Sequence, residues 1–275
     1  MQAPQISFQD GHSIPQVGLG VWQTPQEATA QAVVAAFKAG YRHIDTAAVY
    51  ENEAGVGDGI KEAGIPRSDI FITTKLWNSE QGADSTLKAF DTSMAKLGLE
   101  YLDLYLIHWP SPARKKYVET WKAFKRLQNE GRIRSIGVSN FEPEHLTRII
   151  DETGVVPVLN QVELHPQFQQ RELRAFHERH GIVTQAWSPL GQGRLLRNPS
   201  IEAIAKKHSK TAAQVIVRWH IELSNVVIPK SVNPTRIAEN FDVFDFALDE
   251  DDLTVIAGLD KSDGRIGPNP LAAEF

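Results

Sequence analysis

The sequence predicts an α/β protein with the architecture of a (β/α)8 TIM barrel, preceded by a β-hairpin that covers the bottom of the barrel. Short apolar runs alternate with amphipathic helical segments in about eight units of very roughly 30 residues. No Pro-, Gly- or Ser-rich linker interrupts this alternation. Most of the apolar runs also end in a polar, charged or aromatic residue. In a parallel barrel all strand C-termini meet on one rim, where active sites are built.

The expected elements follow from local patterns. Residues 5–15 form the hairpin, because Asp10 and Gly11 can occupy two turn positions with positive φ. A first strand lies near residues 17–22. The later strands are apolar runs that lead into Asp45, Lys75, His108, Ser139, Gln161, Trp187 and Lys230. Helices are expected over residues 27–38, 53–63, 83–97, 116–129, 142–151, 171–179 and 211–223, with a last one that begins near Asn233 and Pro234.

Length and composition fit a single domain, residues 1–275, with an ordinary hydrophobic core. The apolar fraction of 41% and the charged fraction of 23% are those of a globular protein, and the net charge of −5 argues against a nucleic-acid partner. The absence of cysteine excludes disulfides and thiolate sites and fits a cytoplasmic location. Neither a signal peptide nor a membrane span is expected, because no apolar run approaches about 20 residues.

Two common binding motifs do not match. Three Gly-x-Gly pairs begin at Gly18, Gly55 and Gly191, but none has the third glycine that a Rossmann dinucleotide site needs. These glycines are better explained by loops and turns. The segment His-Glu-Arg-His at residues 177–180 lacks the spacing of the HExxH zinc motif, so no metal site is expected.

Four side chains at or near the ends of successive strands suggest proton chemistry. Tyr50 follows Asp45 in the loop after the second strand, Lys75 ends the third strand and His108 ends the fourth. A lysine ammonium favours the phenolate form of a nearby tyrosine and so lowers its pKa, and a carboxylate can keep that lysine charged. An imidazole can donate a hydrogen bond to a carbonyl oxygen. Together these groups suit a reaction that turns a carbonyl into an alkoxide, such as hydride addition.

Each of these residues also has an ordinary structural interpretation when it is taken alone. Asp45 could cap a helix, and Lys75 could be a surface lysine. Tyr50 could be a packed aromatic residue and His108 a core histidine. Their joint placement at successive strand ends favours the catalytic interpretation.

A second group of polar residues follows the eighth strand. Lys230 and Arg236 flank the start of a helix at which Asn233 suits the N-cap and Pro234 the first helical position. Barrels often bind phosphate at this place, at a helix N-terminus. Two cations beside that helix end favour a phosphomonoester.

The sequence resembles the aldo-keto reductase family along essentially its whole length, and within it most closely the bacterial 2,5-diketo-D-gluconate reductase group. Five collinear motifs carry the resemblance: DTAAVYENE at 45–53, LYLIHWP at 104–110, IGVSNF at 136–141, NQVELHP at 160–166 and IPKS at 228–231. The resemblance implies a reductase of aldehydes and ketones in which Tyr50 is the general acid, Lys75 lowers its pKa, Asp45 pairs with Lys75 and His108 orients the substrate carbonyl.

The resemblance also implies NADPH as the cofactor. The implied contacts come from Ser139, Asn140, Gln161, Trp187, Ser188, Leu190, Gln192, Lys230, Ser231, Arg236, Glu239 and Asn240. The first three would hold the nicotinamide carboxamide, Trp187 would stack on the ring, and Arg236 would stack on adenine. Asn233 stands where the family often has a basic residue, which leaves one fewer cation for the 2′-phosphate.

For the substrate, the resemblance implies a pocket walled by Trp22, Trp77 and Trp109 beside His108. The loops around it are shorter than in steroid-handling relatives, which predicts an open pocket for small polar carbonyls, diketones or keto-sugars, although the tail after residue 264 could fold over the site. No obligate protein partner is expected, and the family precedent is a monomer. Two alternatives remain: a non-catalytic nicotinamide-binding regulatory module, and a glycosidase that uses Asp45 and Glu163.

Overall fold

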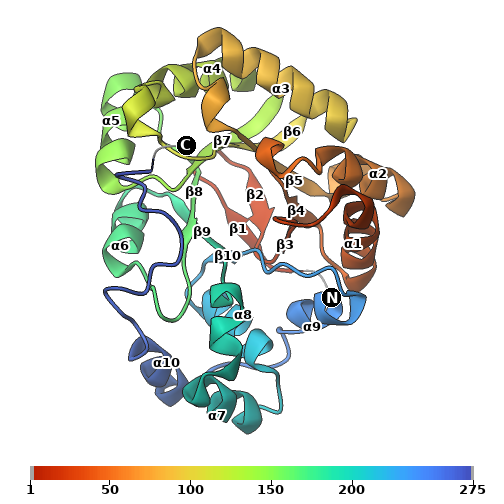
Figure 1. The fold of residues 1–275 in the computed structure, drawn as a ribbon, viewed down its shortest axis with the longest axis vertical. Helices are drawn as coiled ribbons and strands as arrows, with labels where there is room; N and C mark the ends of the chain where they lie inside the picture. The colour runs from red at the N-terminus through yellow and green to blue at the C-terminus, as the bar shows by residue number, and fades with distance from the viewer. Residues whose placement is uncertain (1–2, 274–275) are drawn as a thin grey trace.

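The computed structural model describes residues 3–273 and shows a closed barrel of parallel strands inside a ring of helices (Figure 1). The barrel strands are β3 (Leu19–Gly20), β4 (His43–Asp45), β5 (Phe71–Leu76), β6 (Leu102–Ile107), β7 (Ile133–Ser139), β8 (Leu159–Glu163), β9 (Val183–Trp187) and β10 (Val226–Val227). They pair in chain order. Parallel bridges from Val17 to Val227 and from Gly20 to Lys230 close the ring. The predicted fold class is therefore confirmed.

Within residues 3–273, eight α-helices alternate with the strands as predicted, and two more α-helices lie beside them. The predicted helices are α1 (Gln26–Ala39), α2 (Glu53–Ala63), α3 (Ala83–Leu97), α4 (Tyr117–Asn129), α5 (Pro143–Thr153), α6 (Arg171–Arg179), α8 (Ala212–Glu222) and α9 (Pro234–Phe241). The sequence pattern missed α7 (Pro199–Lys207) and α10 (Glu250–Ala257), which pack together at the bottom of Figure 1.

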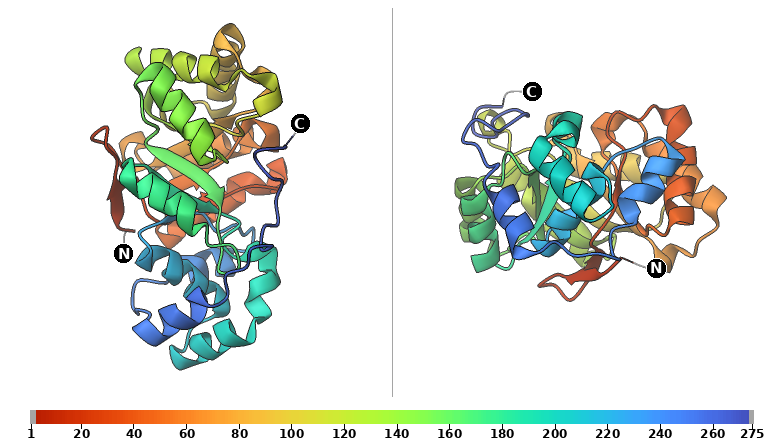
Figure 2. Two further views of the ribbon diagram at one scale, coloured as in Figure 1. Left: turned by 90° about the vertical axis from the view of Figure 1, so that its left-hand side faces the viewer. Right: turned by 90° about the horizontal axis from the view of Figure 1, so that it is seen from below.

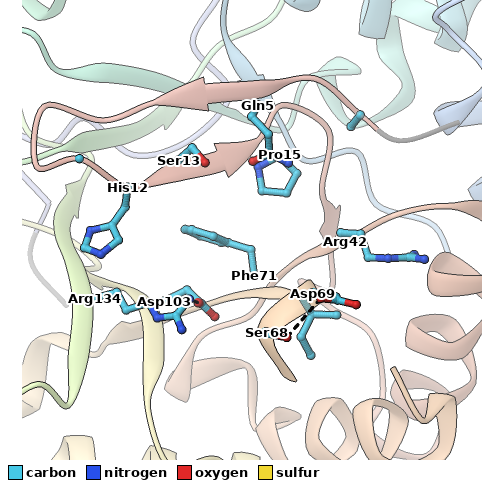
Figure 3. A pocket seen from close by; sticks show the side chains of 13 residues that line it. Gln5, His12, Ser13, Pro15, Arg42, Ser68, Asp69, Phe71, Asp103 and Arg134 are labelled. Carbon is cyan, nitrogen blue, oxygen red and sulfur yellow. Dashed lines mark hydrogen bonds and ion pairs between the residues drawn. The ribbon is translucent and has the colours of Figure 1, made fainter. Parts of the chain in front are cut away.

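The N-terminal hairpin covers the amino ends of the barrel strands. It consists of β1 (Gln5–Ser7) and β2 (Ser13–Pro15). Phe8 and Ile14 pack on Phe71, the first residue of β5, in a small core that is separate from the main one. Figure 2 shows the hairpin on the opposite side of the barrel from the C-terminal segment. A surface pocket of about 480 Å³ lies beneath the hairpin, with Phe71 among the residues that line it (Figure 3).

The interior of the barrel changes from apolar to polar along its axis. Phe71 and Leu104 fill the end below the hairpin. His43 and Thr73 come next and lie in contact through Nε2 and Oγ1 at 3.3 Å. A side chain at Gly18 would overlap the ring of His43, so glycine is required there. The polar layers above this point lead to the carboxyl rim.

The helices of residues 3–273 include none long and apolar enough to cross a membrane.

Candidate active site

A large cleft opens at the carboxyl ends of the barrel strands. Its volume is about 1320 Å³. All but one of the site residues predicted from the sequence line this cleft, and Lys75 lies just beneath it. The lining residues are Trp22, Asp45, Tyr50, Trp77, His108, Trp109, Ser139, Asn140, Gln161, Trp187, Ser188, Leu190, Gln192, Lys230, Ser231, Arg236, Glu239 and Asn240. The structure thus brings together side chains that are spread over more than two hundred positions of the chain.

Lys75 connects Asp45 with Tyr50 beneath the cleft. Its Nζ donates to Oδ1 of Asp45 at 2.6 Å, to the backbone oxygen of Thr46 at 2.8 Å and to the Tyr50 hydroxyl at 3.4 Å. The lysine is completely buried. Since an ammonium has three hydrogens, this environment satisfies all of them. Because the lysine occupies an acceptor position of the Tyr50 oxygen, the hydroxyl hydrogen is left for another acceptor.

Burial and the charge of Lys75 act on the pKa of Tyr50 in opposite directions. Lys75 lowers this pKa, as predicted, but burial raises it by more, and the net direction is upward. Removal of the phenolate from water has the larger effect, which the sequence did not show. Burial acts to lower the pKa of Lys75, but Asp45 and Tyr50 raise it by more, so the lysine is charged. Burial raises the pKa of Asp45 against the opposing effects of Lys75 and Gln161.

His108 faces Tyr50 from the next strand but one. Their ring centroids are 5.6 Å apart in an edge-to-face arrangement, and Trp77 packs on His108 in the same way at 5.3 Å. Burial, together with the charge of Lys75, holds the pKa of His108 well below its usual range. The imidazole is therefore neutral and carries one N–H. A neutral imidazole can donate a hydrogen bond to an oxygen in the cleft without adding a second buried cation.

The side chain of Asn140, at the end of β7, is held by three hydrogen bonds. Its Nδ2 donates to the backbone oxygen of His108 at 3.0 Å and to Oγ of Ser139 at 3.1 Å. Its Oδ1 accepts from Nε1 of Trp187 at 2.8 Å. The residue has a φ of 62°, the left-handed conformation that asparagine tolerates better than most residues. These contacts set the orientation of both its amide and the Trp187 indole.

Gln161 connects the end of β8 with the proton-transfer group. Its Nε2 donates to Oδ2 of Asp45 at 2.7 Å and to Oε1 of Gln185 at 2.9 Å. Both amide hydrogens are therefore used inside the barrel, and the carbonyl oxygen of the side chain remains as an acceptor. The Ser139 hydroxyl donates to the backbone oxygen of Gln161 at 2.8 Å, which ties β7 to β8 at the rim.

The far end of the cleft is positively charged. Asn233 caps α9 by accepting from the backbone N–H of Arg236 at 3.1 Å, and Pro234 is the first helical residue, as predicted. Lys230 and Arg236 are exposed, and neither forms an ion pair within residues 3–273. Two unpaired cations next to a helix N-terminus are suited to hold a phosphate group.

The walls of the cleft include one segment that sequence reasoning missed, the start of α8, and one whose position it left open, the C-terminal tail. Thr211, Ala212 and Ala213 at the start of α8 line it, as do residues 266–268 of the C-terminal segment. The prediction that the pocket is built mainly by three tryptophans is therefore incomplete. The capping box in which Thr211 and Gln214 bond to each other could have indicated the helix end, but no local pattern indicates the position of the C-terminal segment.

Among residues 3–273, no group of three or more His, Cys, Asp or Glu side chains is arranged to hold a metal ion. The buried pair Glu163 and His165 instead contact each other at 3.1 Å. His177 contacts Asn160 and Thr184 within the structure.

The site thus combines a tyrosine, a buried charged lysine and a neutral histidine at the carboxyl rim of a parallel barrel. The model of the aldo/keto reductase family matches residues 16–261. The chain belongs to the aldo/keto reductase family.

Individual relatives agree with this assignment. The chain is 63% identical over 273 residues to an aldo-keto reductase of Mycolicibacterium smegmatis, with 99% of each chain covered. It is 53% identical over 267 residues to methylglyoxal reductase DkgA of Escherichia coli, with 96% of each covered. The crystal structure of a Gox0644 mutant in complex with NADPH is similar over 100% of both chains, with 57% identity and a TM-score of 0.97.

Proposed function

We propose that this protein reduces small aldehydes and ketones to alcohols with NADPH, by hydride transfer to the carbonyl carbon and protonation of its oxygen by Tyr50. The contact between the Tyr50 hydroxyl and the buried, charged Lys75 is the observation that supports this most directly. It places a phenol with an available hydrogen next to a cation on the floor of a large cleft.

The residues of the cleft fit NADPH along its length. Lys230 and Arg236 are unpaired cations for the 2′-phosphate, with Ser231 next to Lys230 in the loop before α9. The carbonyl oxygen of Gln161 can accept from the nicotinamide carboxamide, and Asn140 holds the Trp187 indole at the place where the ring would stack. Ser188, Leu190 and Gln192 line the path between these two ends, and Glu239 and Asn240 lie near the adenine end. NADPH supplies the hydride when it is bound.

The protein's own residues provide the proton and stabilise the developing charge. The N–H of neutral His108 orients the substrate oxygen, and the Tyr50 hydroxyl gives its proton to that oxygen as the alkoxide forms. The resulting phenolate is stabilised by Lys75, whose charge Asp45 balances. Because the pKa of Tyr50 is raised, the tyrosine keeps its proton throughout the neutral range.

The substrates are small carbonyl compounds, diketones or keto-sugars that fit between Trp22, Trp77, Trp109 and the C-terminal segment. Methylglyoxal is the first compound to test, because a relative that is 53% identical is a methylglyoxal reductase. We further propose that residues 1–275 act as one domain, as a cytoplasmic monomer without an obligate protein partner.

The test is a panel of methylglyoxal, aliphatic aldehydes, diketones and keto-sugars, in which kcat/KM is measured by NADPH consumption. We expect turnover with several of these compounds, and higher kcat/KM with NADPH than with NADH. Tight NADPH binding without turnover of any carbonyl would contradict the proposal and favour a regulatory nicotinamide-binding module.

A further inference from the structure

One buried carboxylate holds the C-terminal segment against the cleft. Glu163 lies at the end of β8 and is 1% exposed. Its Oε1 accepts from the backbone N–H of Ile266 at 2.6 Å and from Nε2 of His165 at 3.1 Å. Its Oε2 accepts from the backbone N–H of Gly267 at 2.8 Å. Both oxygens of the carboxylate are therefore engaged, two of the three donors being backbone groups of the C-terminal segment.

Glu163 is well suited to this arrangement because an ionised carboxylate only accepts hydrogen bonds. Burial acts to raise the pKa of Glu163, but the hydrogen bonds from His165, Gly267 and Ile266 lower it by more, and the net direction is downward. The charged form is thus the stable one. Hydrogen bonds to a charged acceptor are stronger than those between neutral groups.

The segment that Glu163 holds is in close contact with Trp187. A Cβ atom added at Gly267 would lie 2.6 Å from Cη2 of Trp187 and 3.0 Å from Oε2 of Glu163. The backbone at Gly267 therefore lies against the edge of the indole, and only glycine fits. Ile266, Gly267 and Pro268 all line the cleft. The position of this wall consequently depends on the carboxylate beneath it.

Other contacts of the C-terminal segment lie outside the cleft. Asp260 accepts from the backbone N–H of Gln169 at 2.9 Å, and Arg265 forms an ion pair with Glu142 at 3.3 Å. Within residues 3–273, the hydrogen bonds to Glu163 are the ones that Ile266 and Gly267 make. Loss of Glu163 would therefore release the wall while the preceding residues stay attached.

We propose that Glu163 is a positioning residue that determines substrate size: by holding Ile266 and Gly267, it fixes one wall of the carbonyl pocket and favours small substrates over bulky ones. This inference rests on the proposed function, since it requires that the cleft binds carbonyl substrates. Glu163 acts through the backbone of the C-terminal segment and needs no contact with the substrate.

The first test compares Glu163→Gln with the wild type on methylglyoxal and on a bulky aryl diketone. A glutamine offers one acceptor oxygen and places an NH₂ group against a backbone N–H, so the wall should move. We expect KM for methylglyoxal to rise by up to about tenfold, the limit set by the energy of one charged hydrogen bond that holds the wall. The preference for methylglyoxal over the diketone should fall, while kcat and the Kd of NADPH stay within about twofold. Arg265→Gln, which removes the outer ion pair with Glu142 and the contact with the Phe168 ring, is the matched control and should leave both KM values within about twofold.

The second test asks whether the effect passes through the C-terminal segment. Gly267→Ala should displace the same wall by steric overlap with Trp187, and it keeps Glu163, so it also serves if Glu163→Gln does not fold. In the double variant the KM for methylglyoxal should be no more than about twofold above that of the worse single variant, because both changes release one element. Trypsin should cut after Arg265 at least about fivefold faster in Glu163→Gln than in the wild type.

The outcomes separate the two proposals. Unchanged KM values and unchanged proteolysis in Glu163→Gln would overturn the role of Glu163, as would effects of the two substitutions that multiply in the double variant. A wild type that consumes no NADPH with any carbonyl would instead overturn the proposed function.

Discussion

Replacing Tyr50 with phenylalanine should separate catalysis from folding and cofactor binding. The substitution removes one hydroxyl, whose contact with Lys75 is 3.4 Å long. The lysine keeps its shorter hydrogen bonds to Asp45 at 2.6 Å and to Thr46 at 2.8 Å. Because the substitution leaves one hydrogen of the buried ammonium without an acceptor, we expect the free energy of unfolding to fall by about 1–3 kcal/mol.

The effect on the reaction should be much larger. Loss of a positioned proton donor lowers a rate by about 10²- to 10⁴-fold, which corresponds to about 3–5.5 kcal/mol of activation free energy. Phenylalanine keeps the ring that packs edge-to-face on His108, so the cleft retains its shape. The loss of transition-state stabilisation should therefore exceed the loss of folding stability.

The assay for Tyr50→Phe is NADPH consumption with methylglyoxal, together with titration of NADPH binding and urea unfolding. Tyr101→Phe is the control, since its hydroxyl contacts the backbone oxygen of Arg67 at 3.5 Å, away from the cleft, and should leave turnover unchanged. Retention of more than about a tenth of the wild-type kcat by Tyr50→Phe would refute the assignment of the proton donor. A loss of NADPH affinity as large as the loss of turnover would also refute the assignment of Tyr50 as the proton donor.

Three further predictions follow from the same geometry. Lys230→Ala and Arg236→Ala should each weaken the binding of NADPH by about 1.5–3 kcal/mol and the binding of NADH much less, because only NADPH carries the 2′-phosphate. Equal losses of affinity for the two cofactors in a binding titration would contradict the phosphate site. Asp45→Asn should lower the free energy of unfolding by about 3–5 kcal/mol in urea, since it leaves a fully buried ammonium without its counter-charge. Burial lowers the pKa of His43 and His220 to about 3. The unfolded chain therefore takes up these protons first, and each histidine should cost about 1.4 kcal/mol of stability per pH unit as the pH falls from about 6.5 towards 3. In His220→Gln, the free energy of unfolding measured in urea should fall less steeply between about pH 6 and about pH 4, by nearly that amount per pH unit.

Much of the fold could be predicted because its signals are local. The bounds of α2, α3 and α6 coincide with the predicted ranges. Gly64 and Gly98 end the first two in the left-handed conformation that a helix C-terminus favours. The convergence of the strand-end residues could also be predicted, because closure of a parallel barrel brings all strand C-termini to one rim.

The remaining features depend on contacts between distant positions. The amino-acid pattern gave no sign that Glu163 would accept from Ile266 and Gly267, whose backbone N–H groups carry no sequence signal. The net shift in the pKa of Tyr50 could not be predicted for a related reason, although the effect of Lys75 was predicted in the right direction. The identity of its neighbour could be predicted from the sequence, but the depth of its burial could not, and burial has the larger effect.

One carboxylate within the site connects the proton-transfer group with the proposed cofactor contact. Asp45 accepts from Lys75 through one oxygen and from Gln161 through the other. The same carboxylate therefore keeps the lysine charged beneath Tyr50 and sets the orientation of the glutamine amide, whose carbonyl oxygen is left for the cofactor. Because Gln185 Oε1 accepts the second amide hydrogen, a reversed Gln161 amide would place its oxygen against two acceptors, the Asp45 carboxylate and the Gln185 oxygen. The buried polar layer of the barrel thus fixes the proton donor and the nicotinamide contact relative to each other, which hydride and proton transfer to one carbonyl group require.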